Sequence, residues 1–162
     1  MFHRFLTSPF APLTALLVAL IISLLVYTFF RPEMDGRVFF YPDNNGVRFG
    51  SERRGIPARK DTDGRIDVFI SELFLGPVGL EWSKAAPRGT QVRHVAVLDR
   101  TVYVDLNARI LGTDDEMPIT FQQALDNLER NIRYNFPRVE EIVFTVEGRQ
   151  VHAPYYAEER VQ

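Results

Sequence analysis

Cysteine is absent from this chain of 162 residues. Without a thiol, the protein has no disulfide, no thiolate metal site, no catalytic cysteine and no cysteine for lipid attachment. Acidic residues are missing from the first 32 positions, although the whole chain holds 21 of them against 19 basic residues. Glycine-rich phosphate loops and the local motifs of serine hydrolases and zinc proteases are also missing. The sequence therefore provides no positive argument for an enzyme.

An uncharged apolar run occupies residues 10–30, between Arg4 and Arg31. As a helix it would extend roughly 32 Å, against about 30 Å of bilayer hydrocarbon. It ends in Tyr-Thr-Phe-Phe-Arg rather than in the small residues of a signal-peptide cleavage site. We therefore predict an uncleaved transmembrane anchor in preference to a signal peptide or a buried core helix.

The basic residues near the two ends of the run do not decide its orientation, because Arg4 precedes it and Arg31, Arg37 and Arg48 follow it. The N-terminal tail is short, and a long folded domain is translocated largely regardless of its charges. We expect a single-pass protein of the cell membrane with its C-terminal domain outside the cytoplasm.

The expected organisation has five parts. They are a tail at 1–9, the anchor at 10–30, a linker at 31–36, one domain at 37–153 and a second tail at 154–162. Without Arg4 and Arg31, the chain keeps 17 basic and 21 acidic residues, a net charge of −4. This charge argues against binding of nucleic acid.

Alternating strand and helix patterns follow one another along the domain. A hairpin is expected at 38–42 and 47–49, and another at 91–98 and 101–106 with its turn at Asp99-Arg100. Helices are expected from Asp61 to Leu75, before Gly76-Pro77, and from a Thr120/Gln123 capping box to Pro137. An irregular loop spans 76–90, and a last strand spans 141–147 before the turn at Gly148. The prediction is an α+β fold with two helices on a mostly antiparallel or mixed sheet.

The second hairpin makes a detailed prediction. Pairing Leu98 with Thr101 sets His94 opposite Asp105, where a carboxylate can orient an imidazole or simply form an exposed cross-strand pair. The same register places a set of apolar residues on the core face: Val95, Val97, Val102, Val104 and Leu106.

Two further features are candidates for binding a partner. Trp82 lies in the Gly/Pro-rich loop, where it either anchors a partner or covers the core. A basic stretch surrounds Gly55-Ile56-Pro57 and is either a solvated loop or a docking surface for an acidic partner; its members are Arg53, Arg54, Arg59, Lys60 and Arg65. No metal-ligand spacing or cofactor motif occurs, so we expect neither metal nor cofactor.

Several segments together resemble the GerMN domain of sporulation and germination proteins, over roughly residues 37–151. They are Val38-Phe39-Phe40-Tyr41-Pro42, Glu72-Leu73-Phe74-Leu75-Gly76-Pro77, the stretch 86–92, the hairpin 95–106 and the stretch 139–148. The resemblance implies an extracytoplasmic domain akin to ring-building modules, which acts by binding other proteins and has no catalytic residues to transfer. The family's sporulation member is a lipoprotein with tandem copies, whereas this chain has no cysteine and room for one copy.

These observations favour a non-catalytic interaction or assembly module in the cell envelope. The expected partners are the membrane and envelope proteins, with a homo-oligomer left open. The alternative is a small envelope enzyme or a regulator of peptidoglycan remodelling that uses His94 and Asp105.

Overall fold

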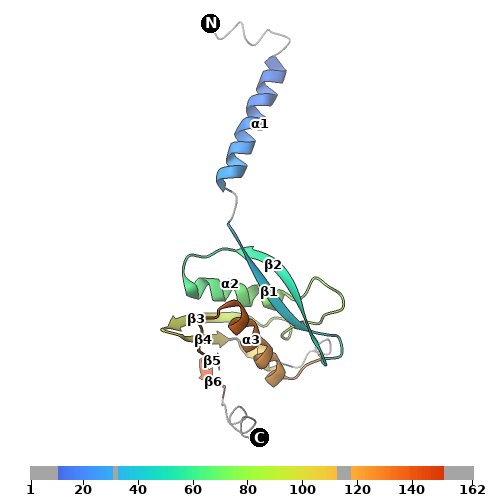
Figure 1. Ribbon diagram of the computed structural model, residues 1–162, viewed down its shortest axis with the longest axis vertical. Coiled ribbons are helices and arrows are strands. Elements are labelled where there is room, and N and C mark those ends of the chain that lie inside the picture. The colour runs from blue at the N-terminus through green and yellow to red at the C-terminus, as the bar shows by residue number, and fades with distance from the viewer. Residues whose placement is uncertain (1–10, 31–32, 113–117, 152–162) are drawn as a thin grey trace. The chain divides into compact units, whose positions relative to one another are not determined.

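The computed structural model describes residues 11–30, 33–112 and 118–151 (Figure 1). The chain divides into two compact units, Met1–Glu33 and Met34–Gln162, which are described separately. The first contains helix α1, Ala11–Phe30, and its side chains from Pro12 onward are exposed. Among the described residues, α1 is the one helix long and apolar enough to cross a membrane. Its length, composition and place near the N-terminus fit a membrane anchor or a signal sequence.

The second unit opens with an antiparallel ribbon formed by β1, Met34–Pro42, and β2, Phe49–Pro57. The expected hairpin is present, with Pro42 opposite Phe49, but both strands are longer than predicted. β1 begins three residues before the domain boundary expected at position 37. The prediction of a loop around Gly55-Ile56-Pro57 is wrong, because these residues pair with β1. Pro57 lies at the end of an edge strand, where its missing N–H removes no ladder bond.

Two long helices begin and end near the residues that the sequence indicates. α2, Thr62–Leu75, is capped by the Asp61 side chain, which accepts a hydrogen bond from the backbone N–H of Gly64. α3, Phe121–Asn135, carries the predicted capping box between Thr120 and Gln123. A short 3₁₀ helix, η2, Ala108–Leu111, was not predicted.

A second, four-stranded sheet has the order β3-β4-β5-β6. It consists of β3, Val92–Leu98; β4, Thr101–Leu106; β5, Glu141–Val146; and β6, Arg149–Gln150. The predicted pairing of Leu98 with Thr101 is confirmed. β4 and β5 are parallel, joined through η2 and α3, while the other neighbours are antiparallel. The structure thus has two sheets where the sequence pattern indicated one.

The two helices lie between the β1–β2 ribbon and the four-stranded sheet (Figure 1). α2 packs against β2 and β3, and α3 packs against β1. Phe39 of β1 stacks on Phe69 of α2 with ring centroids 4.8 Å apart, and Phe136 meets Phe69 edge-on at 5.6 Å. The predicted core face of the second hairpin is confirmed: Val95, Val102, Val104 and Leu106 are buried and Val97 is partly buried against them.

Candidate functional site

The basic residues expected to form one surface fall into two environments. Arg53, Arg59 and Lys60 are exposed, the first on β2 and the other two in the segment that leads to α2. Arg54 also lies on β2, but its guanidinium is 4.5 Å from the centre of the Phe39 ring. Because successive side chains of a strand point to opposite faces, the side chains of Arg53 and Arg54 lie on opposite faces of β2.

Arg54 takes part in a partly buried polar cluster between the ribbon and the end of α2. Its Nη2 donates a hydrogen bond to the hydroxyl of Tyr41, a fully buried side chain. That hydroxyl lies 3.2 Å from the carbonyl oxygen of Leu73 and 3.1 Å from that of Gly76. Burial raises the pKa of the Tyr41 hydroxyl above its usual range, so it stays protonated and able to donate. These contacts join β1, β2 and the end of α2.

Trp82 packs against the ribbon from the loop. It is partly buried against the core, and Trp82 and Asp43 form an isolated antiparallel bridge. A Cβ atom added at Gly50 would lie 2.1 Å from the Trp82 ring, so the indole approaches the backbone of β2 directly. Glycine at position 50 is what leaves room for this contact.

His94 and Asp105 are opposite each other, as the predicted register requires. The carboxylate of Asp105, however, accepts hydrogen bonds from the Thr145 hydroxyl at 2.7 Å and the Gly148 amide at 2.8 Å. Its second oxygen lies 3.2 Å from the Arg93 guanidinium. The Thr145 hydrogen bond is the leading cause that lowers the Asp105 pKa below its usual value. The carboxylate thus secures the turn between β5 and β6.

Three asparagines on α3 form an interaction that sequence reasoning missed. Asn135 accepts a hydrogen bond from the N–H of Val38 and donates one to its carbonyl oxygen. Asn131 does the same for Phe40, and Asn127 donates to the Phe40 carbonyl as well. The amides therefore occupy the edge of β1 that β2 leaves free. The available signal was their spacing of four residues, which places them on one face of a helix.

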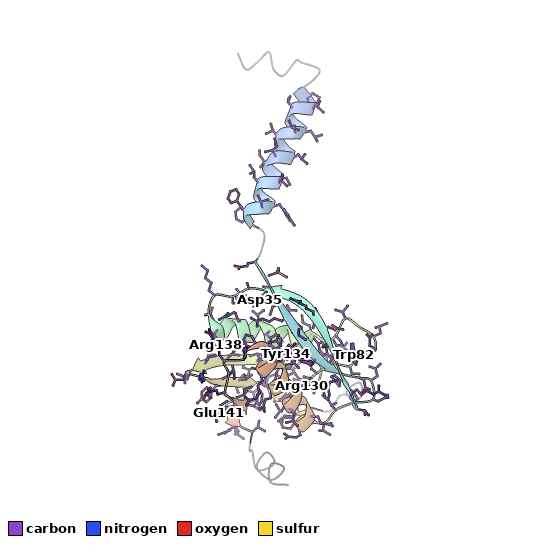
Figure 2. The ribbon with its side chains drawn as sticks, viewed as in Figure 1. Asp35, Trp82, Arg130, Tyr134, Arg138 and Glu141 are labelled. Atoms are coloured by element: carbon purple, nitrogen blue, oxygen red, sulfur yellow. The ribbon has the colours of Figure 1, made fainter. Side chains whose placement is uncertain are left out.

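Arg130 and Tyr134, also on α3, add side-chain contacts with β1 to those of the asparagines (Figure 2). The Arg130 guanidinium lies 4.8 Å from the Phe40 ring centre, and the Tyr134 ring meets Phe40 edge-on at 5.0 Å. The helix thus covers one edge of the ribbon with both amide and aromatic contacts.

The last residue of α2 and the apolar loop that follows it present three aliphatic side chains to solvent. Leu75, Val78 and Leu80 are 73%, 75% and 94% exposed. The Glu52 carboxylate accepts hydrogen bonds from the backbone N–H groups of Val78 and Gly79, the latter at 2.7 Å. The loop is therefore held against β2 while its aliphatic side chains stay exposed.

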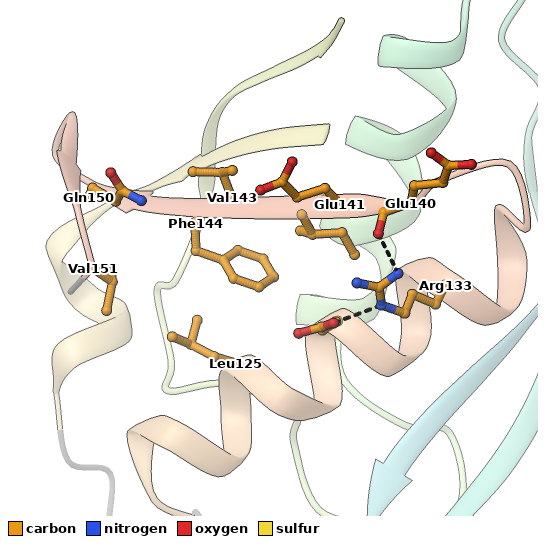
Figure 3. A pocket seen from close by; sticks show the side chains of 10 residues that line it. Leu125, Arg133, Glu140, Glu141, Val143, Phe144, Gln150 and Val151 are labelled. Atoms are coloured by element: carbon orange, nitrogen blue, oxygen red, sulfur yellow. Dashed lines mark hydrogen bonds and ion pairs between the residues drawn. The ribbon is translucent and has the colours of Figure 1, made fainter. Parts of the chain in front are cut away.

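A hollow of about 350 Å³ lies between α3 and β5 (Figure 3). Leu125, Glu129 and Arg133 line its helical side, and Phe144 points into it from β5. The Arg133 guanidinium bonds the Glu129 carboxylate at 2.7 Å and the carbonyl oxygen of Glu140 at 3.0 Å. The loop was predicted, but neither this hollow nor the exposure of the loop's aliphatic side chains was expected, because both depend on elements distant in sequence. Among the described residues, no group of three or more His, Cys, Asp or Glu side chains is placed to hold a metal ion.

Residues 37–152 match the family Germane, described as sporulation and spore germination. The chain belongs to the Germane family. The resemblance indicated by the sequence is thereby confirmed. No curated protein matches the chain.

Solved structures of GerMN domains share this Germane fold. The first GerMN domain of the sporulation protein GerM from Bacillus subtilis is similar with a TM-score of 0.55 and 16% identity, over 72% of this chain and 86% of that one. The structure of the tandem GerMN domains of the same protein is similar with a TM-score of 0.55 and 15% identity, over 74% of this chain and 41% of that one. The α+β class and the GerMN fold are thus confirmed.

Proposed function

We propose that this Germane domain is a non-catalytic protein-interaction and assembly module of the cell envelope. In this proposal α1 is a single-pass anchor and the domain lies outside the cytoplasm. The observation that carries the interaction role is the exposure of Leu75 at the end of α2 and of Val78 and Leu80 in the loop that follows. Exposed aliphatic groups that gather on one segment are typical of protein-binding sites.

The fixed backbone of this loop supports the proposal. Glu52 holds the N–H groups of Val78 and Gly79, and the Asn44 side chain donates a hydrogen bond to the carbonyl oxygen of Leu80. Binding of a partner to these side chains therefore costs little conformational entropy, because the loop is already ordered. A membrane tether raises the effective concentration of the domain near other envelope proteins, so a modest pairwise affinity is sufficient.

Site-specific photo-cross-linking in intact cells tests the interaction role. A photoreactive residue in place of Leu80 should capture an envelope protein or a second copy of this chain. The same residue in place of Asp126, which is exposed on α3, is the control. Recovery of monomer alone from both variants would contradict the proposal.

The orientation has its own test. Protease added to intact spheroplasts should digest the domain, since the proposal places it outside the cytoplasm. A domain that stays intact until the cells are lysed would reverse the orientation without affecting the interaction role.

The alternative role in peptidoglycan remodelling depends on His94 and Asp105. It has less support, because the Asp105 carboxylate already bonds Thr145, Gly148 and Arg93. Replacement of His94 by Ala leaves those bonds intact. If the cellular function survives this change but is lost on replacement of Leu80 by Glu, the interaction role is favoured over the catalytic one.

A further inference from the structure

We propose that the free edge of β5, beside the hollow between α3 and β5, binds an extended basic segment of a partner protein. The segment would add to the sheet as an antiparallel strand in line with β6. This inference rests on the proposed function, because it assigns a second surface and a binding mode to the same interaction module.

In the part of the chain that the structure describes, β5 is paired along only part of this edge. β6 contains only Arg149 and Gln150, which pair with Val146 and Thr145. The N–H of Val151 then donates to the carbonyl oxygen of Phe144 at 3.2 Å. Over the described residues, no strand continues this ladder beside Ile142. An unpaired edge of this kind offers backbone N–H and C=O groups to an extended peptide.

The hollow beside that edge can accept a side chain of the added strand. Phe144 and Leu125 point into the hollow, while Val143 and Glu141 point to the other face of the sheet (Figure 3). In an antiparallel strand that continues from β6, the residue opposite Ile142 would face the hollow. The hollow is at the lower end of the ~300–1,000 Å³ range of ligand pockets. It leaves room for one or two side chains, and Leu125, Ile142 and Phe144 provide apolar contacts in it.

The charge of Glu141 favours a basic segment. In the added strand, the residues before and after the one opposite Ile142 would lie opposite Val143 and Glu141. Their side chains would be on the face of the sheet that points away from the hollow. Glu141 accepts a 3.3 Å hydrogen bond from the Thr101 hydroxyl and has no ion-pair partner among the described residues. The nearby Arg133 already bonds Glu129 and the Glu140 carbonyl. A lysine or arginine opposite Glu141 would therefore gain a cross-strand ion pair.

The same contacts limit the length of the site. The bond from Arg133 to the Glu140 carbonyl closes one end of the open edge, and Val151 closes the other at Phe144. Between them, the segment Glu141–Val143 has no strand on this edge among residues 33–112 and 118–151. The partner segment is consequently short, with an apolar residue next to a basic one.

A fluorescent peptide tests the proposal on the full chain in nanodiscs of zwitterionic lipid. The probe is Lys-Val-Lys-Val-Lys-Val-amide with a fluorophore on its N-terminus, and its controls are the Glu-for-Lys peptide, a version with N-methylated valines, and empty nanodiscs. Fluorescence anisotropy should show binding of the basic peptide, and N-methylation should weaken it at least about tenfold because it removes ladder donors. Hydrogen exchange of the Ile142 amide should slow when the peptide is bound.

Matched variants locate the peptide. Glu141→Gln should weaken binding about threefold at low salt, as expected for one cross-strand charge pair. Glu147→Gln removes the same charge at the far end of β5, outside the hollow, and should have no effect. Equal binding of the basic and acidic peptides, or unchanged exchange at Ile142, would overturn the proposal. Binding only after truncation at Val151 would also overturn it, and would assign the edge to residues 152–162 of the same chain.

The two proposals fail separately. Cross-linking from Leu80 tests the interaction role without involving the β5 edge. If that cross-linking succeeds while the peptide does not bind, the strand-addition proposal is wrong and the interaction role stands.

Discussion

Replacing Asn131 by Ala removes the central contact between α3 and β1. Asn131 is fully buried, and its side-chain oxygen accepts a 2.8 Å hydrogen bond from the N–H of Phe40. Its side-chain nitrogen lies 3.0 Å from the Phe40 carbonyl oxygen and 2.9 Å from that of Asn127. The Phe40 carbonyl keeps a second donor, Asn127, whereas the N–H loses its acceptor.

The cost follows from these contacts. A buried donor left without an acceptor costs about 1–3 kcal/mol, and each further hydrogen bond contributes about 1 kcal/mol. Alanine recovers roughly 0.5 kcal/mol through its better helix propensity. We therefore expect Asn131→Ala to lower the free energy of unfolding by about 3 kcal/mol, and the melting temperature by about 10 °C.

Urea denaturation of the full chain in detergent micelles, followed by Trp82 fluorescence, measures the change. Trp82 reports on the domain because it packs against β2. The control is Asp126→Ala on the exposed face of the same helix, which changes helix propensity by a similar amount. The reasoning is refuted if the two variants unfold within about 0.5 kcal/mol of each other.

Three other changes probe the remaining contacts. Hydrogen bonds hold the Asp105 pKa below its usual value, so this carboxylate stabilises the fold above about pH 4 and its contribution is lost as the pH falls further. In Asp105→Asn, the free energy of unfolding measured in urea titrations should therefore fall less between about pH 5 and pH 3 than in the unmodified protein. An unchanged pH profile would contradict this. Gly50→Ala should cost about 1–3 kcal/mol through its clash with Trp82, and a double-mutant cycle with Trp82→Ala should show that the two costs are not additive. Arg54→Lys should cost about 1–2 kcal/mol in thermal melts because it loses the contact with the Phe39 ring, whereas Arg53→Lys should stay within about 0.5 kcal/mol.

The candidate surfaces were only partly accessible to sequence reasoning. Composition identified Trp82 and the basic stretch, but it could not distinguish Arg53 from Arg54, because their difference depends on which side of β2 faces the core. The apolar loop was visible as a Gly/Pro-rich segment. The exposure of Leu80 depends on the bond from Asn44 to its carbonyl and on the anchoring of the neighbouring residues by Glu52.

The sequence by itself determined the features that local physics controls. An uncharged run long enough to span a bilayer indicated α1, apolar spacing located α2, a capping box located the start of α3, and a two-residue turn set the register of β3 and β4. The tertiary structure alone decided the parallel pairing of β4 with β5 and the amide contacts that join Asn131 to Phe40 across 91 positions. Such contacts depend on which distant segments meet when the core forms, and periodicity and capping patterns contain no information about that choice.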